Sequence, residues 1–287
     1  MGLKTLAIIK RVLGDALGHF NDDDGWAFAS HVALTALMAL FPFLIFMTAV
    51  AGMMDNTELA DNAVRLLFEA WPDEVAGPIA KEVHTLLTRP RTDLLTVGFL
   101  LTIYLSANGV EALRTALNRA YRVTESRSII YRRIQSIIFV IIGAASMLAL
   151  SFLIVLAPLA WATVMKWFPF IDRFSPQFTL IRYGIAGAVL VIALVIAHLW
   201  LPDGKRLLRD VVPGIAVTLA LWLLGAGLFG AYLEQFADYA STYAGLASVM
   251  TALIFLYLVS AMFILGGELN AAMIRYRKAR AGLVEAD

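Results

Sequence analysis

Uncharged stretches follow one another along almost the whole chain. Six of them contain no Asp, Glu, Lys or Arg, at 25–54, 94–110, 134–165, 183–202, 211–233 and 239–267. A membrane-spanning helix needs about 20 consecutive apolar residues, with about 17 as the lower limit. The pattern therefore predicts one integral membrane domain over 1–287 with six transmembrane helices, at about 27–53, 94–113, 134–160, 183–201, 211–232 and 243–267.

These stretches are continuously apolar and rich in Leu and Ala. The pattern predicts an all-α polytopic bundle and excludes a β-barrel, whose strands alternate between apolar and polar positions. As a helix, the third stretch would be about 48 Å long, against about 30 Å for the hydrocarbon core of a bilayer. We therefore expect it to tilt, project or break, with Pro158 as the break point.

The connections also carry patterns. Residues 1–24 place apolar and basic side chains on opposite faces of a helix, which predicts an amphipathic helix on the inner membrane surface. The acidic run 22–24 is interpreted as the polar start of the first span, with a metal site as the alternative. The outer loop 54–93 has two apolar stripes, which predict two short interfacial helices, and 268–287 is a basic tail.

Basic residues are distributed unevenly between the two sides of the predicted bundle. The N-terminal segment, the loops after the second and fourth spans and the C-terminal tail hold 16 of the 23 Lys and Arg residues. Cytoplasmic loops carry an excess of Lys and Arg, so we expect both termini to be cytoplasmic.

Composition supports the membrane assignment. The chain is 60% hydrophobic and 16% charged, against about 45–50% and about 25% in soluble domains. Together with a mean hydropathy of +0.77, this excludes a two-domain soluble enzyme. The net charge of +1 offers nucleic acid no overall attraction, and the absence of cysteine excludes disulfides and thiolate metal sites.

Six polar residues gather where the second and sixth predicted spans reach the cytoplasmic side: Asn108, Glu111, Arg114, Asn118, Glu268 and Asn270. Ionisable residues at the edge of a membrane often mark a pathway for ions or a contact with head groups. We expect these residues to form a polar vestibule that takes up an ion or an anionic lipid head group. The alternative is local charge pairing along each helix.

Proline and glycine within the spans predict either close helix packing or hinges, at Pro42, Pro158, Pro213, Gly214 and Gly245. The four histidines are far apart, with no pair at the spacing that binds a metal on a helix, and no nucleotide-binding or hydrolase motif is present. We therefore expect no metal, no cofactor and no catalytic residue.

Several segments resemble the YihY/BrkB family of inner-membrane proteins, some of whose members carry the label ribonuclease BN. The matching segments are DDDGWAFASHVALTALMALFPFL at 22–44, EALRTALNRAYRVTESRS at 111–128, the Pro213–Gly214 pair, and the run from YLEQFADYASTYAGLASV to GGELNAA. The resemblance implies a six-helix, multi-pass protein of the bacterial inner (cytoplasmic) membrane. It also implies a link to envelope integrity and to movement of lipids or lipopolysaccharide precursors.

Metal-dependent RNA cleavage needs clustered His and Asp ligands, so the four scattered histidines argue against a ribonuclease. Our leading hypothesis is a transporter or lipid-translocating protein, with membrane lipids as partners through their anionic head groups. The alternative is a non-transporting scaffold that binds an envelope-assembly protein or forms a homo-oligomer. An intramembrane enzyme would need a catalytic pair, and the neighbours Ser30 and His31 point in different directions on a helix.

Overall fold

The computed structural model describes residues 2–53, 92–242 and 244–282, and within these ranges the chain is helical and contains no strand. The helices are α1 (Gly2–Asp22), α2 (Gly25–Met53), α5 (Thr92–Ala120), α6 (Ile129–Ser151), η1 (Phe152–Leu156), α7 (Ala157–Trp167), η2 (Pro169–Phe174), α8 (Ser175–Trp200), α9 (Leu208–Thr242) and α10 (Ala244–Arg280). The predicted all-α architecture is confirmed.

Five helical stretches of the described chain are long and apolar enough to cross a membrane: Thr96–Ala120, Ile129–Trp167, Pro169–Trp200, Leu208–Leu233 and Val249–Arg280. The predicted first span coincides with α2, in which Gly25–Ala39 counts as a shorter apolar helix. The helical membrane bundle is confirmed, and the count of six spans stays a prediction. The two interfacial helices predicted within 54–93 fall almost wholly outside the described residues, as does the end of the tail at 283–287.

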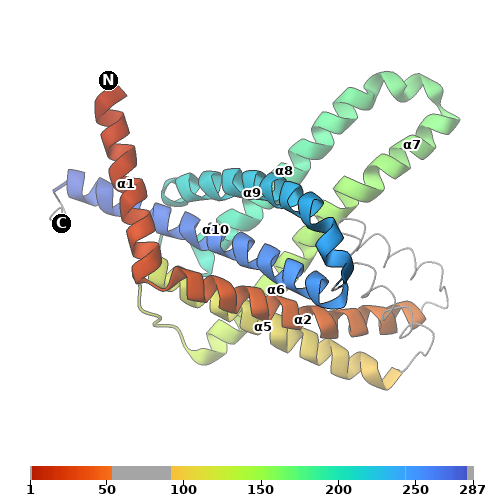
Figure 1. The fold of residues 1–287 in the computed structure, drawn as a ribbon, viewed down its shortest axis with the longest axis horizontal. Coiled ribbons are helices and arrows are strands. Elements are labelled where there is room, and N and C mark those ends of the chain that lie inside the picture. Colours follow the sequence, from red (N-terminus) through yellow and green to blue (C-terminus); the bar gives the residue numbers. More distant parts are fainter. Residues whose placement is uncertain (1, 54–91, 243, 283–287) are drawn as a thin grey trace.

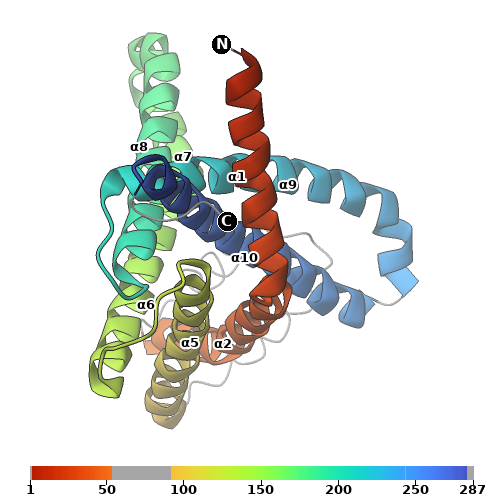
Figure 2. The same cartoon turned by 90° about the vertical axis from the view of Figure 1, so that its left-hand side faces the viewer.

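The helices α2, α5 and α10 lie side by side, and α9 packs along α10 (Figure 1). The continuous helix α6–η1–α7 pairs with α8 in a long hairpin that extends away from the other helices (Figures 1 and 2). The ends of α5, α8 and α10 meet the starts of α6 and α9 at one end of the molecule. We call this the polar end, and the ends of the chain lie there too (Figure 1).

Helix α1 lies crosswise to α2 and α10 at the polar end (Figure 1). It packs through Val12 and Ala16 against Leu269 and Ala272 of α10, where small side chains allow close approach. Leu17, on the neighbouring side of α1, is 52% exposed. Only part of the apolar face of α1 therefore packs against the other helices. One apolar row on the protein and one exposed row fit an amphipathic helix, and its place on the inner membrane surface stays a prediction.

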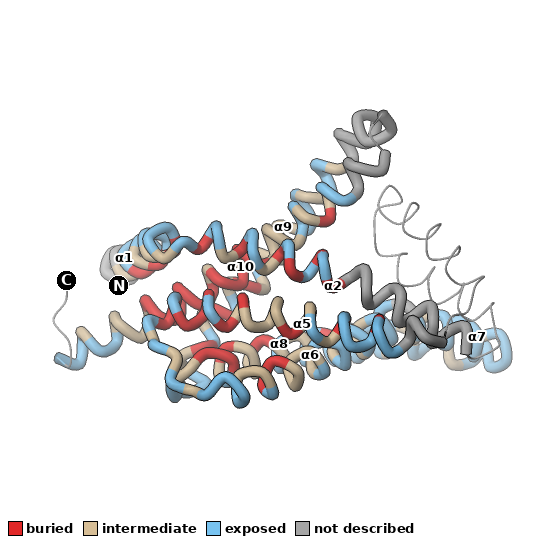
Figure 3. Tube along the Cα trace, turned by 90° about the horizontal axis from the view of Figure 1, so that it is seen from below, coloured by how far each residue is buried: buried red, intermediate tan, exposed pale blue. Residues whose placement is uncertain are grey.

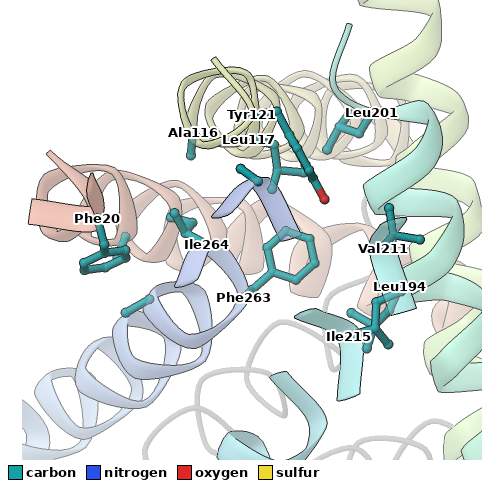
Figure 4. Close-up of a cluster of buried hydrophobic side chains, with 13 residues drawn as sticks. Phe20, Ala116, Leu117, Tyr121, Leu194, Leu201, Val211, Ile215, Phe263 and Ile264 are labelled. Atoms are coloured by element: carbon teal, nitrogen blue, oxygen red, sulfur yellow. The ribbon is translucent and has the colours of Figure 1, made fainter. Parts of the chain in front are cut away.

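Buried residues concentrate toward the polar end (Figure 3). There Phe20, Leu117, Leu194, Ile215 and Phe263, from five different helices, form a shared apolar core (Figure 4). The α6–α8 hairpin is different, because its large apolar side chains face outward. Such a surface is stable in contact with lipid but not with water, which agrees with a membrane location.

The long third stretch neither breaks nor stays regular at Pro158. One π-helical turn, η1, precedes the proline and lets the helix continue into α7. Proline has no N–H, so the carbonyl four residues earlier, that of Ile154, loses its helical partner. Arg182 of α8 replaces that partner, because its Nη1 donates to the oxygen of Ile154 at 3.2 Å and lies 3.5 Å from that of Leu153.

The same device recurs at Pro213, inside α9. The carbonyl four residues earlier belongs to Arg209, and Nη1 of Arg277 from α10 donates to it at 3.2 Å. Each proline is thus matched by an arginine of a neighbouring helix that satisfies the freed carbonyl. Both prolines therefore lie at contacts between helices, and the choice between packing and hinge stays a prediction.

This pairing predicts non-additive stability effects. Arg182→Leu removes the donor to the Ile154 carbonyl, while Pro158→Ala supplies a new N–H that can bond the same carbonyl. We expect Arg182→Leu to destabilise the protein by about 1 kcal/mol more in the wild-type background than in the Pro158→Ala background. Thermal unfolding of the four purified proteins in detergent measures this coupling, and strictly additive effects would contradict it.

Candidate functional site at the polar end

The side of α5 that faces α6 carries a buried arginine. Arg114 is 1% exposed and forms an ion pair with Glu111 one turn earlier. Its Nη2 donates to the Ser136 hydroxyl at 2.7 Å and to the Arg132 carbonyl at 2.9 Å, both on α6. Glu111 also binds the Arg132 guanidinium at 3.2 Å, and Arg133 donates to Asn108 at 2.8 Å. These charges join α5 to α6.

Asn118 lies one turn beyond this group, where α5 meets two loops. Its amide nitrogen donates to Glu125 at 2.9 Å, and its oxygen accepts from the backbone N–H of Asp203 at 2.8 Å. Arg127 binds Glu125 through two nitrogens at 2.7 Å each and donates to the carbonyl of Leu201. The loop after α5 is thereby attached to the loop after α8.

Asp203 completes this attachment. It accepts from the N–H and the hydroxyl of Ser126 at 2.7 and 2.6 Å and from the N–H of Gly204 at 2.7 Å. The hydrogen bonds from Ser126 lower the pKa of Asp203 from its ordinary 3.8 to about 2. Only the ionised carboxylate accepts all three bonds, so the contact depends on that charge.

This shift predicts an acid-dependent loss of stability. A carboxylate with a lowered pKa stabilises the fold above its unfolded pKa, and the contribution disappears as the pH falls through the folded value. We expect wild type to unfold at a higher temperature than Asp203→Asn at pH 5, with the difference vanishing between about pH 4 and pH 2. A thermal unfolding series in detergent measures it, and a constant difference down to pH 2 would contradict the assignment.

A second group of buried polar residues links α5, α8, α9 and α10. The N–H of Gly214 donates to Asn270 at 2.6 Å, and Asn270 donates to the Tyr121 hydroxyl at 3.1 Å. That hydroxyl lies 3.0 Å from Nδ1 of His198, and burial raises the pKa of Tyr121, so the phenol is neutral. The Tyr121 hydroxyl thus joins Asn270 of α10 to the imidazole of His198 on α8. Nε2 is buried and has no partner.

A cluster of charges lies where α1, α5 and α10 meet. Glu268 is 1% exposed and lies within electrostatic range of Asp15, Asp23, Arg122 and Arg275. Arg275 binds Asp15 at 2.6 Å. One oxygen of Glu268 and one of Asp23 are buried without a hydrogen-bond partner, and burial raises the pKa of Asp23. We call these five residues the charge cluster.

Arg122 of the charge cluster has an unusual backbone. Its φ is 55°, in the left-handed region that favours glycine, and Val123 and Arg122 donate to the carbonyls of Asn118 and Arg119 in the pattern that ends many helices. An arginine there costs about 1 kcal/mol or more. The strain therefore belongs to the way in which α5 ends, and the candidate site rests on the buried, unpartnered oxygens of Glu268 and Asp23.

The six predicted vestibule residues divide between these groups. Asn108, Glu111 and Arg114 face α6, Asn118 holds the loops, and Asn270 contacts α9. Among the described residues, no hydrogen bond or ion pair joins Glu268 to Glu111. Only the Glu111–Arg114 ion pair is local pairing along one helix, since the other contacts of the α5 residues reach α6 and the loops. Glu268 and Arg114 each keep one buried atom without a hydrogen-bond partner. Whether any of the six takes up a ligand stays a prediction.

The other predicted positions have different surroundings. Gly214 contacts α10 closely, because a Cβ there would overlap the carbonyl oxygen of Gly266 and lie 2.6 Å from Asn270. Pro42 and Gly245 lie within α2 and α10, in stretches whose side chains are not described. The acidic turn binds a neighbouring helix, since Asp24 pairs with Arg119 at 2.9 Å. No group of three His, Asp or Glu in the described ranges could hold a metal ion.

These networks also contain residues outside the six predicted ones, among them Gln135, Ser136 and His198. Gln135 and Ser136 are fully buried polar residues at the start of the third predicted span. Their polarity among apolar neighbours was a usable signal. His198 lies near the end of the fourth predicted span, yet it is 0% exposed, because Phe263 and Tyr121 enclose it.

Comparisons with known proteins agree with this architecture. The chain is 27% identical over 266 residues to the "Putative ribonuclease-like protein YfkH" of Bacillus subtilis (strain 168), covering 93% of this chain and 96% of that protein. It is 25% identical over 275 residues to a UPF0761 membrane protein of Rhodospirillum centenum, covering 93% of this chain but 58% of the relative. A UPF0761 membrane protein of Cronobacter sakazakii is 24% identical, with 91% and 87% covered.

No solved structure matches the chain. The family model described as "Virulence factor BrkB" matches residues 16–286. That range takes in the C-terminal third of α1, from residue 16 to Asp22, every predicted span and all the polar residues described above except Asp15. This multi-pass helical membrane protein therefore belongs to the BrkB family.

Proposed function

We propose that the protein is a transporter of the bacterial cytoplasmic membrane that moves a lipid or an envelope precursor. The observation that carries the proposal is the charge cluster, with its buried and unpartnered oxygens of Glu268 and Asp23. A buried polar atom without a partner costs about 1–3 kcal/mol. Packing alone does not offset that cost, whereas a charged or hydrogen-bonding ligand that bonds these oxygens does.

The chemistry of the charge cluster suits an amphiphilic substrate. Arg122 and Arg275 can attract a phosphate or another anionic head group, and Glu268 can accept from hydroxyl or ammonium groups. The apolar spans beside the polar end suit hydrocarbon. Membrane lipids are therefore the proposed partners, and nucleic acid is not.

The proposed orientation places the polar end and both chain termini in the cytoplasm, following the distribution of Lys and Arg. Because the chain has no cysteine, a single introduced cysteine can report its own side. We expect Lys205→Cys at the polar end to react only with reagents that enter the cytoplasm, and Lys166→Cys near the hairpin tip to react from outside.

Lipid movement in vesicles tests the function. We expect reconstituted protein to move fluorescent lipids or envelope precursors faster than empty vesicles do, and Glu268→Gln to lower the rate at least about tenfold, a loss of about 1.4 kcal/mol. Asp172→Asn is the matched control, because Asp172 is an exposed carboxylate in η2, far from the charge cluster. No movement above empty vesicles across a broad panel would refute the transporter.

A scaffold that binds an envelope-assembly protein or a second copy is the competing function. The observation that favours it is the exposed aromatic tip of the hairpin, where Trp167 and Phe170 are 78% and 66% exposed. It predicts normal envelope function in Glu268→Gln, and loss of function when Trp167 and Phe170 are replaced by Ser. The transporter predicts the opposite pattern.

The non-enzymatic role also belongs to the proposal. The words "ribonuclease-like" are part of the name of the Bacillus relative. We expect purified protein to leave single- and double-stranded RNA intact with or without divalent cations.

A further inference from the structure

Beyond the polar end, the contact between α9 and α10 opens into a cavity. Its volume is about 280 Å³. The walls are Trp222, Gly225 and Phe229 of α9 and Phe255, Val259 and Met262 of α10. At Gly225 the helices come close, since a Cβ there would lie 2.6 Å from the terminal carbon of Met262. Toward the polar end, the Gly214–Gly266 contact closes the space between the helices.

The lining offers no hydrogen-bonding group to an occupant. The only polar side-chain hydrogen, on the Trp222 indole, donates to the Val259 carbonyl at 3.0 Å. The other lining side chains are hydrocarbon, aromatic or thioether, and the backbone is helical. Water needs two to four polar partners, so it is disfavoured here, as is any polar solute. The occupant must be apolar.

The cavity lies at the depth of lipid chains. The Asp210–Arg277 ion pair marks where α9 and α10 leave the polar end. From Asp210, Trp222 and Phe229 lie about 18 and about 28 Å along α9, against a hydrocarbon core about 30 Å thick. The outward side of α9 beside the cavity carries Leu223 and Leu228, which are 78% and 74% exposed. The cavity is therefore continuous with a lipid-facing surface.

Its size selects among apolar occupants. A helix is about 10–12 Å wide with side chains, so even one turn at a pitch of about 5.4 Å would exceed 280 Å³. A helix of a second copy would therefore place only side chains in the cavity. An apolar cavity of about 150 Å³ is enough to take up benzene, and a segment of a hydrocarbon chain fits this larger one.

We infer that the cavity between α9 and α10 is a binding site for one hydrocarbon chain of a bilayer lipid. The inference goes beyond the proposed function, because it requires a bound lipid and no movement of that lipid. The hydrocarbon chain would fill the space that Trp222 and Phe255 leave open between the two helices. The lipid is then held as a ligand, unlike the exchanging lipid around the hairpin.

Tryptophan fluorescence tests this site directly. In a variant that keeps Trp222 as its single tryptophan, phosphatidylcholine with brominated chains is titrated into the detergent-solubilised protein. We expect quenching of Trp222 to saturate at a single lipid per chain. A matched variant carries its single tryptophan at position 223 (Trp222→Phe with Leu223→Trp), where quenching should follow the lipid-to-detergent ratio without saturating.

Filling the cavity provides the second arm. Ala226→Phe and Leu258→Phe both add a ring at the lining, so at least one folded variant should be obtained, and each should abolish the saturable quenching. Ala220→Phe, on the same helix outside the lining, should keep it. Saturable quenching that survives both fillings would overturn the inference. The inference would also fail if Trp222 showed no quenching, or if its quenching followed that of the tryptophan at position 223. Absent quenching together with the mass of a dimer would assign the cavity to a second copy.

Discussion

Replacing Arg114 by leucine is expected to lower the free energy of unfolding by about 3 kcal/mol. Arg114 is 1% exposed, and it bonds at once to Glu111, Ser136 and the Arg132 carbonyl. Leucine fills part of the volume but leaves Glu111 and the carbonyl short of a donor between α5 and α6. Removing one partner of a buried ion pair is costly, because the other stays behind without compensation. Thermal unfolding monitored by size exclusion in detergent measures the loss.

Arg119→Leu is the matched control on the same helix. Arg119 pairs with Asp24, but their side chains are 48% and 67% exposed, so the loss should stay below about 1 kcal/mol. Glu111→Gln combined with Arg114→Leu should cost less than the sum of the single changes, since the two residues share one network. If Arg114→Leu unfolds within a degree of wild type, Arg114 is not the link between the helices.

Gly214→Ala is expected to separate α9 from α10 and to cost at least about 3 kcal/mol. A methyl group at Gly214 would overlap the carbonyl oxygen of Gly266 and lie 2.6 Å from Asn270. The atom in the way is backbone, so no side-chain rotation relieves the overlap. The 2.6 Å bond from the Gly214 N–H to Asn270 would be lost as the helices move apart. Gly266→Ala should act similarly, because its methyl would meet Thr218 and the Gly214 carbonyl.

Two other glycines of α9 provide controls with the opposite sign. Gly227 and Gly230 have no atom within 4 Å of an added Cβ. Alanine is favoured over glycine inside a helix by about 1 kcal/mol, so Gly227→Ala and Gly230→Ala should be neutral or stabilising. The measurement is the unfolding temperature of the four variants together with the yield of monodisperse protein. Equal effects at all four positions would refute close packing at Gly214.

The sequence predicted local features well, because they depend on neighbours along the chain. A helix of apolar residues follows from composition over about 20 positions, and α5, α8, α9 and α10 all contain the stretches expected. Glu111 and Arg114 are three apart, so their contact on one helix face was foreseeable. The break expected at Pro158 was wrong, because a π-helical turn just before the proline lets the helix continue through it.

Tertiary structure decided which distant residues meet. Glu111 and Glu268 have similar places in the sequence, each at the cytoplasmic end of a predicted span. In the fold, Glu111 pairs with Arg132 of α6, whereas Glu268 lies near the carboxylates of Asp15 and Asp23. That difference depends on how α10 crosses α1 and α5, which periodicity does not encode. Likewise, Arg182 and Arg277 look like ordinary basic residues, and only packing places them on the carbonyls that Pro158 and Pro213 release.

The sequence by itself thus determined that this is a membrane protein, that it is helical and where most of the apolar helices lie, because hydrophobicity and helix length are local quantities. Only the tertiary structure separated Gly214, which α10 contacts, from Gly227, which faces open space. It alone also revealed the unpartnered oxygen of Glu268 and the cavity beside Trp222. Both features form where helices that are distant in sequence pack together, so no single segment of the sequence predicts them.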